Sequence, residues 1–418
     1  MNIELLDSLT RHRWSRRAAL QAGGAGFAAF ALGTAGQSVA TAQTGTPLAT
    51  GSPVATADEP AFPAAEQLAF EAIVAASLAQ TETPGALVGV WYPGRGTWLH
   101  ATGIGDLATA TWMTVDDHVR IASITKTFVA TVILQLVDEG KLGLDDLLES
   151  LIPGIPNGTE ITLRQVLGMD AGIYDFVHDS AVAVDYNVDP LHAFSPEDAL
   201  AIIKASTPDF TPGEKVQYSN SNYILLGLII EQLTGHAPSD EIVTRILTPL
   251  GMTNTSFAAT PDMPMPYAHG YTNAMTGEAL RDVTRSNPDL PWTSGAMVST
   301  LADLRIWAKA LVEGTLLTPA TQRERLIMGP IESEPIRVGY GLGILELNGL
   351  LGHNGGILGY SSWMVHAPEE DATVVVVTNR GGNEGGTSDP IFIEIVRTLF
   401  PDRFPAAPAT PAAATPVA

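Results

Sequence analysis

The spacing of apolar residues changes twice along the chain, and it predicts which segments are helices and which are strands. First, a helical pattern over 64–80 precedes two short strand candidates, 86–91 and 97–101, which a Pro-Gly turn joins as a hairpin. Helical patterns then dominate until the last part of the chain returns to strands. The predicted later helices cover 123–137, 163–167, 196–205, 223–233, 240–247, 302–312 and 391–399, and the predicted later strands cover 340–347, 361–366 and 373–378.

This order of elements predicts an α/β fold of the α+β type. Strands at both ends of the chain can share one sheet if the helices between them form a separate layer or region. We therefore expect one antiparallel sheet flanked by helices, with an all-helical subdomain inserted between its early and late strands. No internal repeat is evident.

The helix predicted over 123–137 is apolar nearly all round and carries a single charge, Lys126. A lysine in the first turn of a buried helix is destabilising unless it is paired, because burial disfavours the ammonium form. Ser123 lies three residues earlier on the same helical face. A hydroxyl beside an amine of lowered pKa is a nucleophile beside its base. The alternative is structural: Ser123 caps the helix and Lys126 extends to solvent.

Both ends of the chain are typical of segments outside a folded body. Arg16 and Arg17 precede a stretch rich in Ala and Gly that ends in a small-residue cleavage site before Gln43, as in a twin-arginine export signal. An uncleaved anchor is the alternative, although the glycines in this stretch disfavour it. We expect an exported protein, extracellular or associated with the cell envelope, with no stable membrane span after cleavage. The predicted parts are a signal peptide at 1–42, a flexible linker at 43–62, a folded domain at 63–404 and a disordered tail rich in Pro and Ala at 405–418.

Composition excludes several classes of function. The 418 residues include no cysteine, which excludes disulfides, thiolate metal sites and cysteine nucleophiles. The nine histidines form no His-Glu-x-x-His stretch, and we expect no metal and no cofactor. With 22 basic and 45 acidic residues, the chain is too negative to favour nucleic acid or an anionic membrane as partner. We expect a monomer that binds a small molecule or a peptide.

A Ser-Lys pair also needs a proton donor for the leaving group and groups that hold the substrate. Tyr218 and Asn220 lie where the predicted helix over 223–233 is about to begin. A tyrosine near an ammonium can exist partly as phenolate and could move protons between Ser123 and the leaving group. Asn220 offers a donor and an acceptor to a substrate amide. The alternative is that Asn220 is only a helix cap and Tyr218 a surface aromatic.

The stretch Gly-His-Asn-Gly-Gly at 352–356 is the third candidate region. Gly355 and Gly356 allow close backbone approach, so a substrate could pair there and direct its carbonyl at N–H groups. His353 could, when protonated, attract a substrate carboxylate. A glycine-rich hairpin turn with an exposed histidine is the alternative.

Ser-x-x-Lys, Tyr-Ser-Asn and His-x-Gly follow one another at separations of 95 and 135 residues. In this order they resemble the class C β-lactamases and the related serine D-alanyl-D-alanine carboxypeptidases, D-aminopeptidases and esterases. The resemblance implies a β-lactamase/transpeptidase-like fold and a serine hydrolase that forms an acyl-enzyme on an amide or ester. It covers most of 63–400 and includes segments at 161–167, 212–213, 222–227, 250–255 and 299–304.

The same resemblance implies a role for each motif residue. Ser123 would be the nucleophile and Lys126 its base, while Tyr218 would exchange protons with Ser123 and the leaving group. The substrate would be held by Asn220, by His353 in the basic position of the third motif, and by Gly355 and Gly356. The N–H groups of Ser123 and Gly356 would form the oxyanion hole.

Two departures from the family pattern matter. The usual His-Thr-Ser-Gly is replaced by Met-Asp-Ala-Gly at 169–172, which we expect to alter a loop more than the chemistry. His353 stands where the class C β-lactamases usually have lysine, so the resemblance favours a peptidase or esterase over an efficient β-lactamase. A non-catalytic protein that binds or senses envelope ligands is the contrasting hypothesis. A Ser-His-Asp triad is disfavoured because the chain has no Gly-x-Ser-x-Gly.

Overall fold

A computed structural model describes residues 60–273, 279–331, 336–382 and 386–405. The predicted signal peptide, nearly all of the predicted linker and the tail from 406 lie outside the described residues. Those predictions, and the export that follows from them, therefore stay predictions. None of the helices in the described part is long and apolar enough to cross a membrane.

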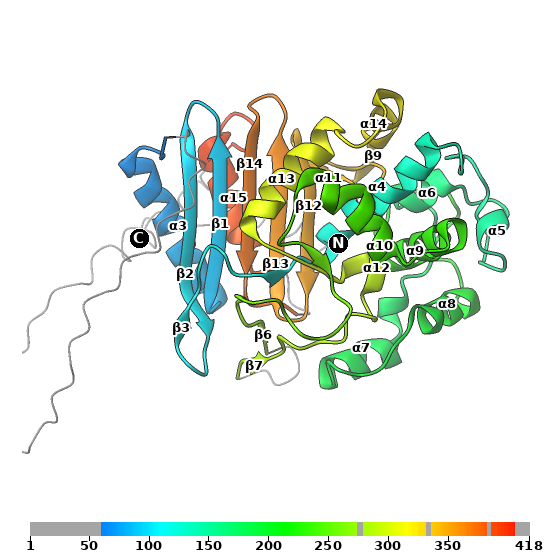
Figure 1. Cartoon of the computed structure of the whole chain (residues 1–418), viewed down its shortest axis with the longest axis horizontal. Coiled ribbons are helices and arrows are strands. Elements are labelled where there is room, and N and C mark those ends of the chain that lie inside the picture. The colour runs from blue at the N-terminus through cyan, green and yellow to red at the C-terminus, as the bar shows by residue number, and fades with distance from the viewer. Residues whose placement is uncertain (1–59, 274–278, 332–335, 383–385, 406–418) are drawn as a thin grey trace, which may run out of the picture.

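One nine-stranded sheet forms the centre of the molecule (Figure 1). Each strand pairs antiparallel with its neighbours, and the early strands join the late ones where β1 pairs with β14. The predicted sheet, built from strands of both ends of the chain, is thus confirmed. The strand order is β3 (Thr111–Trp112), β2 (Gly96–Asp106), β1 (Gly85–Tyr92), β14 (Ala372–Thr378), β13 (Tyr360–Ala367), β12 (Leu350–Ile357), β11 (Leu345–Leu347), β10 (Val338–Tyr340) and β9 (Gly329–Ile331).

Helices cover both faces of this sheet. On one face Trp363 of β13 stacks on Phe392 of α15 (Asp389–Leu399), which packs beside α3 (Ala64–Thr81). On the opposite face α13 (Leu301–Glu313) lies across β13 and β14. Because both faces are covered, β14 carries four consecutive buried valines where a half-exposed strand would alternate.

The chain between β3 and β9 contains the predicted helical region, seen on the right of Figure 1. The helices expected from the 3.6-residue period are present with ends shifted by a few residues. Short strands and turns that lack a clear period complete the region. Its helices are α4 (Thr125–Asp138), α5 (Leu148–Leu151), α6 (Leu163–Gly168), α7 (Ser180–Val188), α8 (Pro196–Ala205), α9 (Asn220–Thr234), α10 (Pro238–Ile242), a π-helical turn (Val243–Leu247), α11 (Thr248–Leu250), α12 (Trp292–Gly295) and α14 (Pro319–Arg325), and its two small sheets contain β4 (Val119–Arg120), β5 (Ser256–Phe257), β8 (Met297–Ser299), β6 (Tyr271–Thr272) and β7 (Arg281–Asp282).

Two predictions in the late strands are wrong. The single strand expected over 340–347 is a hairpin of β10 and β11, and its turn includes Gly343 at a φ of 74°. The stretch 352–356 is not a turn but part of β12, paired with β13 from Leu351 to Ile357. Glycines weaken the strand signal in both places, and pairing with a neighbouring strand overrides them.

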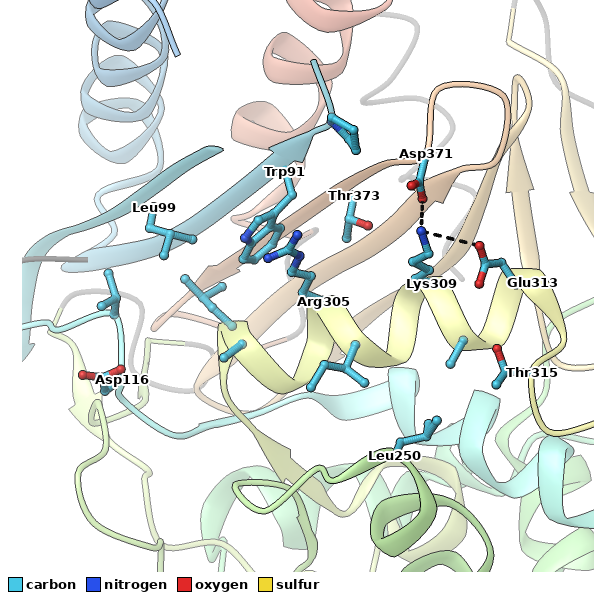
Figure 2. A pocket seen from close by; sticks show the side chains of 16 residues that line it. Trp91, Leu99, Asp116, Leu250, Arg305, Lys309, Glu313, Thr315, Asp371 and Thr373 are labelled. Atoms are coloured by element: carbon cyan, nitrogen blue, oxygen red, sulfur yellow. Dashed lines mark hydrogen bonds and ion pairs between the residues drawn. The ribbon is translucent and has the colours of Figure 1, made fainter. Parts of the chain in front are cut away.

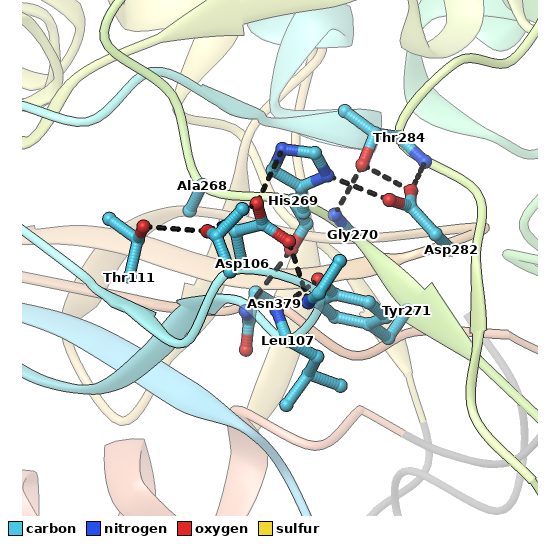
Figure 3. Close-up of polar contacts among 12 residues, drawn as sticks. Asp106, Leu107, Thr111, Ala268, His269, Gly270, Tyr271, Asp282, Thr284 and Asn379 are labelled. Atoms are coloured by element: carbon cyan, nitrogen blue, oxygen red, sulfur yellow. Dashed lines mark hydrogen bonds and ion pairs between the residues drawn. The ribbon is translucent and has the colours of Figure 1, made fainter.

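A polar cluster fastens the segment around β6 and β7 to the edge of the sheet (Figure 3). His269 contacts Asp282 at 2.7 Å, and its backbone carbonyl accepts from Asn379 Nδ2 at 3.1 Å. The Tyr360 hydroxyl donates to the Ala268 carbonyl at 2.7 Å. These contacts hold the segment against the turn that ends β12, close to the third motif.

Candidate active site

Ser123 lies in a single 3₁₀ turn, Ala122–Ile124, that leads into α4. The N-cap of α4 is Ile124 and makes no side-chain cap, so the interpretation of Ser123 as a helix cap is wrong. Ala122 has a φ of 50°, a left-handed conformation that costs about 1–2 kcal/mol for a residue with a Cβ. The turn packs against β12 at Gly355, where a Cβ would lie 2.4 Å from the Ile121 carbonyl oxygen. Close packing on the strand thus holds the strained turn and fixes the position of Ser123.

Lys126 is fully buried, so the alternative in which it extends to solvent is wrong. Its Nζ lies 3.2 Å from Ser123 Oγ, 2.8 Å from Asn220 Oδ1 and 2.7 Å from the Ser294 carbonyl oxygen. Burial lowers the pKa of Lys126 to about 7, against the opposing influence of the Asp175 carboxylate. The amine is therefore substantially neutral near neutral pH and can accept the Ser123 proton.

Tyr218 contacts Ser123 from the other side. Its hydroxyl donates to Ser123 Oγ at 2.7 Å, and its ring lies 4.8 Å from Lys126 Nζ. The residue is half-buried, with its hydroxyl end enclosed, and this burial raises the pKa of Tyr218 well above its ordinary value. The expected partial phenolate is therefore wrong: Tyr218 is a neutral phenol that gives its proton to Ser123.

Asn220 begins α9, and its side chain does not cap that helix. Instead Oδ1 accepts from Lys126, and Nδ2 donates to Asp175 Oδ2 at 3.0 Å. The Met-Asp-Ala-Gly departure lies directly beneath this segment: Met169 Sδ is 3.4 Å from the Ser219 N–H. The replaced loop thus supports the backbone that carries Tyr218 and Asn220.

His353 does not have the role expected of it. It is buried, with 1% of its surface exposed, and burial lowers the pKa of His353 to about 3. Its Nδ1 lies 2.5 Å from the Asn354 carbonyl oxygen, which can only accept, so Nδ1 carries the proton. Nε2 then accepts from the Tyr340 hydroxyl at 3.0 Å. A neutral imidazole with both nitrogens engaged is no anchor for a carboxylate, and the expectation of a protonated His353 is wrong.

The two glycines of the third motif differ in their surroundings. Gly355 is buried and serves the packing of β12 against the Ser123 turn, because a Cβ there would meet Ile121 and Ala122. Gly356 is exposed, and a Cβ there would meet nothing within 4 Å. Open space beside Gly356 leaves room for a substrate next to its backbone, so its part in an oxyanion hole with the Ser123 N–H stays a prediction.

Three contacts of the site were not predicted from the sequence. Asp175 follows no motif, and its carboxylate meets Asn220 only because the loop after α6 folds back onto α9. Ser294 contributes through its carbonyl, which every residue type possesses, and Tyr340 reaches His353 from β10 across the sheet. Within the described ranges no group of three or more His, Asp or Glu side chains is placed to hold a metal ion.

A separate groove of about 730 Å³ lies over α13, away from Ser123 (Figure 2). The Arg305 guanidinium stacks on Trp91 at 5.3 Å, and Lys309 pairs with Asp371 at 2.5 Å and Glu313 at 3.5 Å. Since none of the Ser123 site residues lines this groove, its size does not bear on the chemistry.

Comparison with known proteins agrees with this geometry. A family model described as Beta-lactamase matches residues 70–397. A D-aminopeptidase of Brucella anthropi is 28% identical over 331 residues, which is 78% of this chain and 61% of the relative. The chain thus spans about three fifths of the length of this curated relative.

Solved structures extend the likeness to the fold. A D-stereospecific amidohydrolase from Streptomyces sp. is 31% identical with a TM-score of 0.71, and the match covers 78% of this chain and 97% of that one. A D-amino acid amidase from Ochrobactrum anthropi SV3, complexed with L-phenylalanine, is 25% identical with a TM-score of 0.70, over 79% of this chain and 97% of that one.

Proposed function

Because the chain belongs to the beta-lactamase family of serine hydrolases, we propose that it cleaves amide bonds of D-amino acid amides or D-amino peptides through an acyl-enzyme on Ser123. The observation that carries the proposal is the surrounding of Ser123 Oγ. A buried amine lies 3.2 Å away on one side, and a neutral phenol donates to the oxygen at 2.7 Å on the other. A base and a proton donor thus meet at one hydroxyl, which is the arrangement that acyl transfer needs.

Acylation follows from these positions. Since Tyr218 donates to Ser123 Oγ, the Ser123 proton is free to point at the neutral Lys126 amine. Lys126 takes this proton as Oγ forms a bond to the substrate carbonyl carbon, and the carbonyl oxygen becomes an oxyanion beside the Ser123 and Gly356 N–H groups. Tyr218 then gives its proton to the leaving nitrogen as the C–N bond breaks, and the Lys126 ammonium returns a proton to the Tyr218 oxygen.

Deacylation uses the same groups in reverse. A water gives one proton to the neutral amine of Lys126 as its oxygen bonds to the acyl carbon. When the ester bond to Ser123 breaks, the Ser123 oxygen regains a proton through Tyr218, which is in turn reprotonated by Lys126. Atoms and charge then balance, and the enzyme returns to its starting state.

Charge at the site supports an amide with a free amine over a substrate that ends in a carboxylate. The neutral His353 gives no positive charge, while Asp175 lies near enough to act on the pKa of Lys126. Arg325, the other cation that acts on a tyrosine of the site, is buried and donates to Thr131. The named relatives act on D-configured amino compounds, which supports the same substrate class.

The test combines labelling and turnover. Purified protein is exposed separately to a fluorophosphonate and a penicillin, and adducts are mapped by mass spectrometry. Rates are then compared for D- and L-phenylalanine amide, a D-Ala-D-Ala peptide and a p-nitrophenyl ester. We expect an adduct on Ser123 and preference for the D-amide; folded protein without any adduct would refute the nucleophile and favour a non-catalytic binding protein. Preference for the ester would reassign the enzyme to the esterases.

We also propose export, on the strength of Arg16-Arg17 and the cleavage site before Gln43. Fractionation of expressing cells, with Arg16-Arg17 replaced by Lys-Lys as the control, tests it. Full-length protein that stays in the cytoplasm in both cases would contradict export.

A further inference from the structure

Asp175 is a buried carboxylate, 3% exposed, that reaches the site through Asn220. Its own segment is held in place without the carboxylate. Ser221 Oγ donates to the Tyr174 carbonyl at 2.6 Å and accepts from the Phe176 N–H at 2.9 Å. The position of the backbone and the role of the carboxylate can therefore be separated by experiment.

The carboxylate determines which way the Asn220 side chain faces. A carboxamide has nearly the same shape in both orientations, and only its partners decide between them. An ionised carboxylate accepts and never donates, so the NH₂ of Asn220 must face Asp175. The carbonyl oxygen of Asn220 is thereby left facing Lys126 Nζ at 2.8 Å.

This orientation directs the electron pair of Lys126. Nζ has two partners that can only accept, Asn220 Oδ1 and the Ser294 carbonyl oxygen at 2.7 Å. A neutral amine has two N–H bonds and one electron pair, so donating to both partners leaves the pair facing Ser123 Oγ. With Asn220 reversed, its NH₂ would donate to that electron pair and withdraw it from Ser123.

We propose that Asp175 is the positioning residue of the Ser123-Lys126 pair, because it holds Asn220 as an acceptor and so leaves the free electron pair of Lys126 directed at Ser123. The inference rests on the proposed function, since it assigns a role only if Ser123 is the nucleophile. It adds a residue that touches neither the substrate nor the reacting atoms.

The charge of Asp175 gives this role a separate signature in the pH profile. Its influence raises the pKa of Lys126, against the larger lowering by burial. The other groups facing the amine are uncharged near neutrality: Tyr218 and Tyr223, with rings at 4.8 and 5.5 Å and raised pKa values, and His353, whose pKa is lowered. Removing the carboxylate therefore lowers the pKa of Lys126 and moves the acid limb of acylation to lower pH.

The experiment measures fluorophosphonate labelling of Ser123 by mass spectrometry from about pH 5 to about pH 9, a range on both sides of neutrality. Asp175→Asn is compared with wild type and with Asp209→Asn. The control removes a carboxylate from the same neighbourhood, where it binds Gln217 and does not contact Asn220. We expect Asp175→Asn to label about 10- to 100-fold more slowly on the plateau, with the acid limb at lower pH, and Asp209→Asn to match wild type.

A second variant guards against misfolding. Asp175 also caps the 3₁₀ turn Phe176–His178 by accepting from the Val177 N–H. Serine is itself a good cap, so Asp175→Ser keeps this bond and removes the carboxylate. The expected shift of the acid limb is the same, in protein whose thermal unfolding resembles that of wild type.

Each outcome is decisive. A plateau and acid limb unchanged in both Asp175 variants would overturn the inference and leave the proposed function intact. Slower labelling without a shift of the limb would show that Asp175 is only structural, and would overturn it as well. Failure of wild type to label on Ser123 would refute the proposed function itself.

Discussion

Replacing Lys126 with methionine tests the electrostatic basis of the site. Because the amine is fully buried, folding lowers the pKa of Lys126 from 10.5 to about 7. Between these values the unfolded chain holds a proton that the folded protein lacks, so stability falls as the pH decreases from about 10.5 toward 7. Below about pH 7 both states are protonated and the destabilisation is complete; above about pH 10.5 it vanishes.

The magnitude follows from that difference in pKa. At 1.36 kcal/mol per pH unit, a fall from 10.5 to about 7 destabilises the protein by about 5 kcal/mol at low pH. Over the accessible window from about pH 7 to about pH 9.5, the change amounts to about 3 kcal/mol. Methionine also removes the hydrogen bonds to Asn220 and Ser294, but that loss is the same at every pH. The pH dependence of the difference between the two proteins therefore isolates the charge.

Urea unfolding of wild type and Lys126→Met across this window is the assay. We expect the advantage of the variant, whatever its absolute size, to shrink by about 3 kcal/mol as the pH rises. Lys309→Met is the control, because Lys309 is exposed and Asp371 raises its pKa, so its titration lies above the window. A difference between wild type and Lys126→Met that stays constant with pH would refute a lowered lysine pKa and the base assigned on it.

Further outcomes follow from the same geometry. Acylation by a fluorophosphonate should fall about tenfold per pH unit below about pH 7, and Lys126→Ala should lower it by about 10²–10⁴-fold; a flat profile would contradict the base. Tyr218→Phe should slow hydrolysis of an amide far more than that of a p-nitrophenyl ester, whose leaving group needs no proton; equal losses would contradict the proton-donor role. Gly355→Ala should destabilise the fold by about 1–3 kcal/mol and displace Ser123, since its Cβ would lie 2.4 Å from the Ile121 oxygen, whereas Gly356→Ala should unfold like wild type; similar melting of both would contradict the packing.

The helices and most strands could be predicted from the sequence because their apolar residues repeat at one period over many positions. The helix that begins with Thr125 and the strand of four valines are such cases. The hairpin at 338–347 and the strand at 350–357 were mispredicted because glycines hide a local period, and what defines these strands is pairing with a distant strand. Information of that kind lies in the tertiary fold and not in a short window of sequence.

The candidate site shows the same division between residue type and surroundings. A buried lysine next to a serine signalled a base from the sequence alone, because the cost of burying an ammonium is independent of the fold. His353 and Tyr218 were assigned the wrong protonation state, since their pKa values depend on how completely the neighbouring strands enclose them. Asp175 was invisible for a further reason: its importance depends on a partner 45 residues away.

Activity and stability depend here on the same burial. The surroundings that exclude water from Lys126 destabilise the folded protein and, by the same amount, make the amine a base that is free near neutral pH. Surrounding the amine with more charge would relieve the destabilisation but would also restore the ammonium form and remove the base. A single carboxylate, Asp175, acting through the neutral Asn220, satisfies both requirements. It orients the acceptor that Lys126 needs while standing far enough from Nζ to leave burial the larger influence on its pKa.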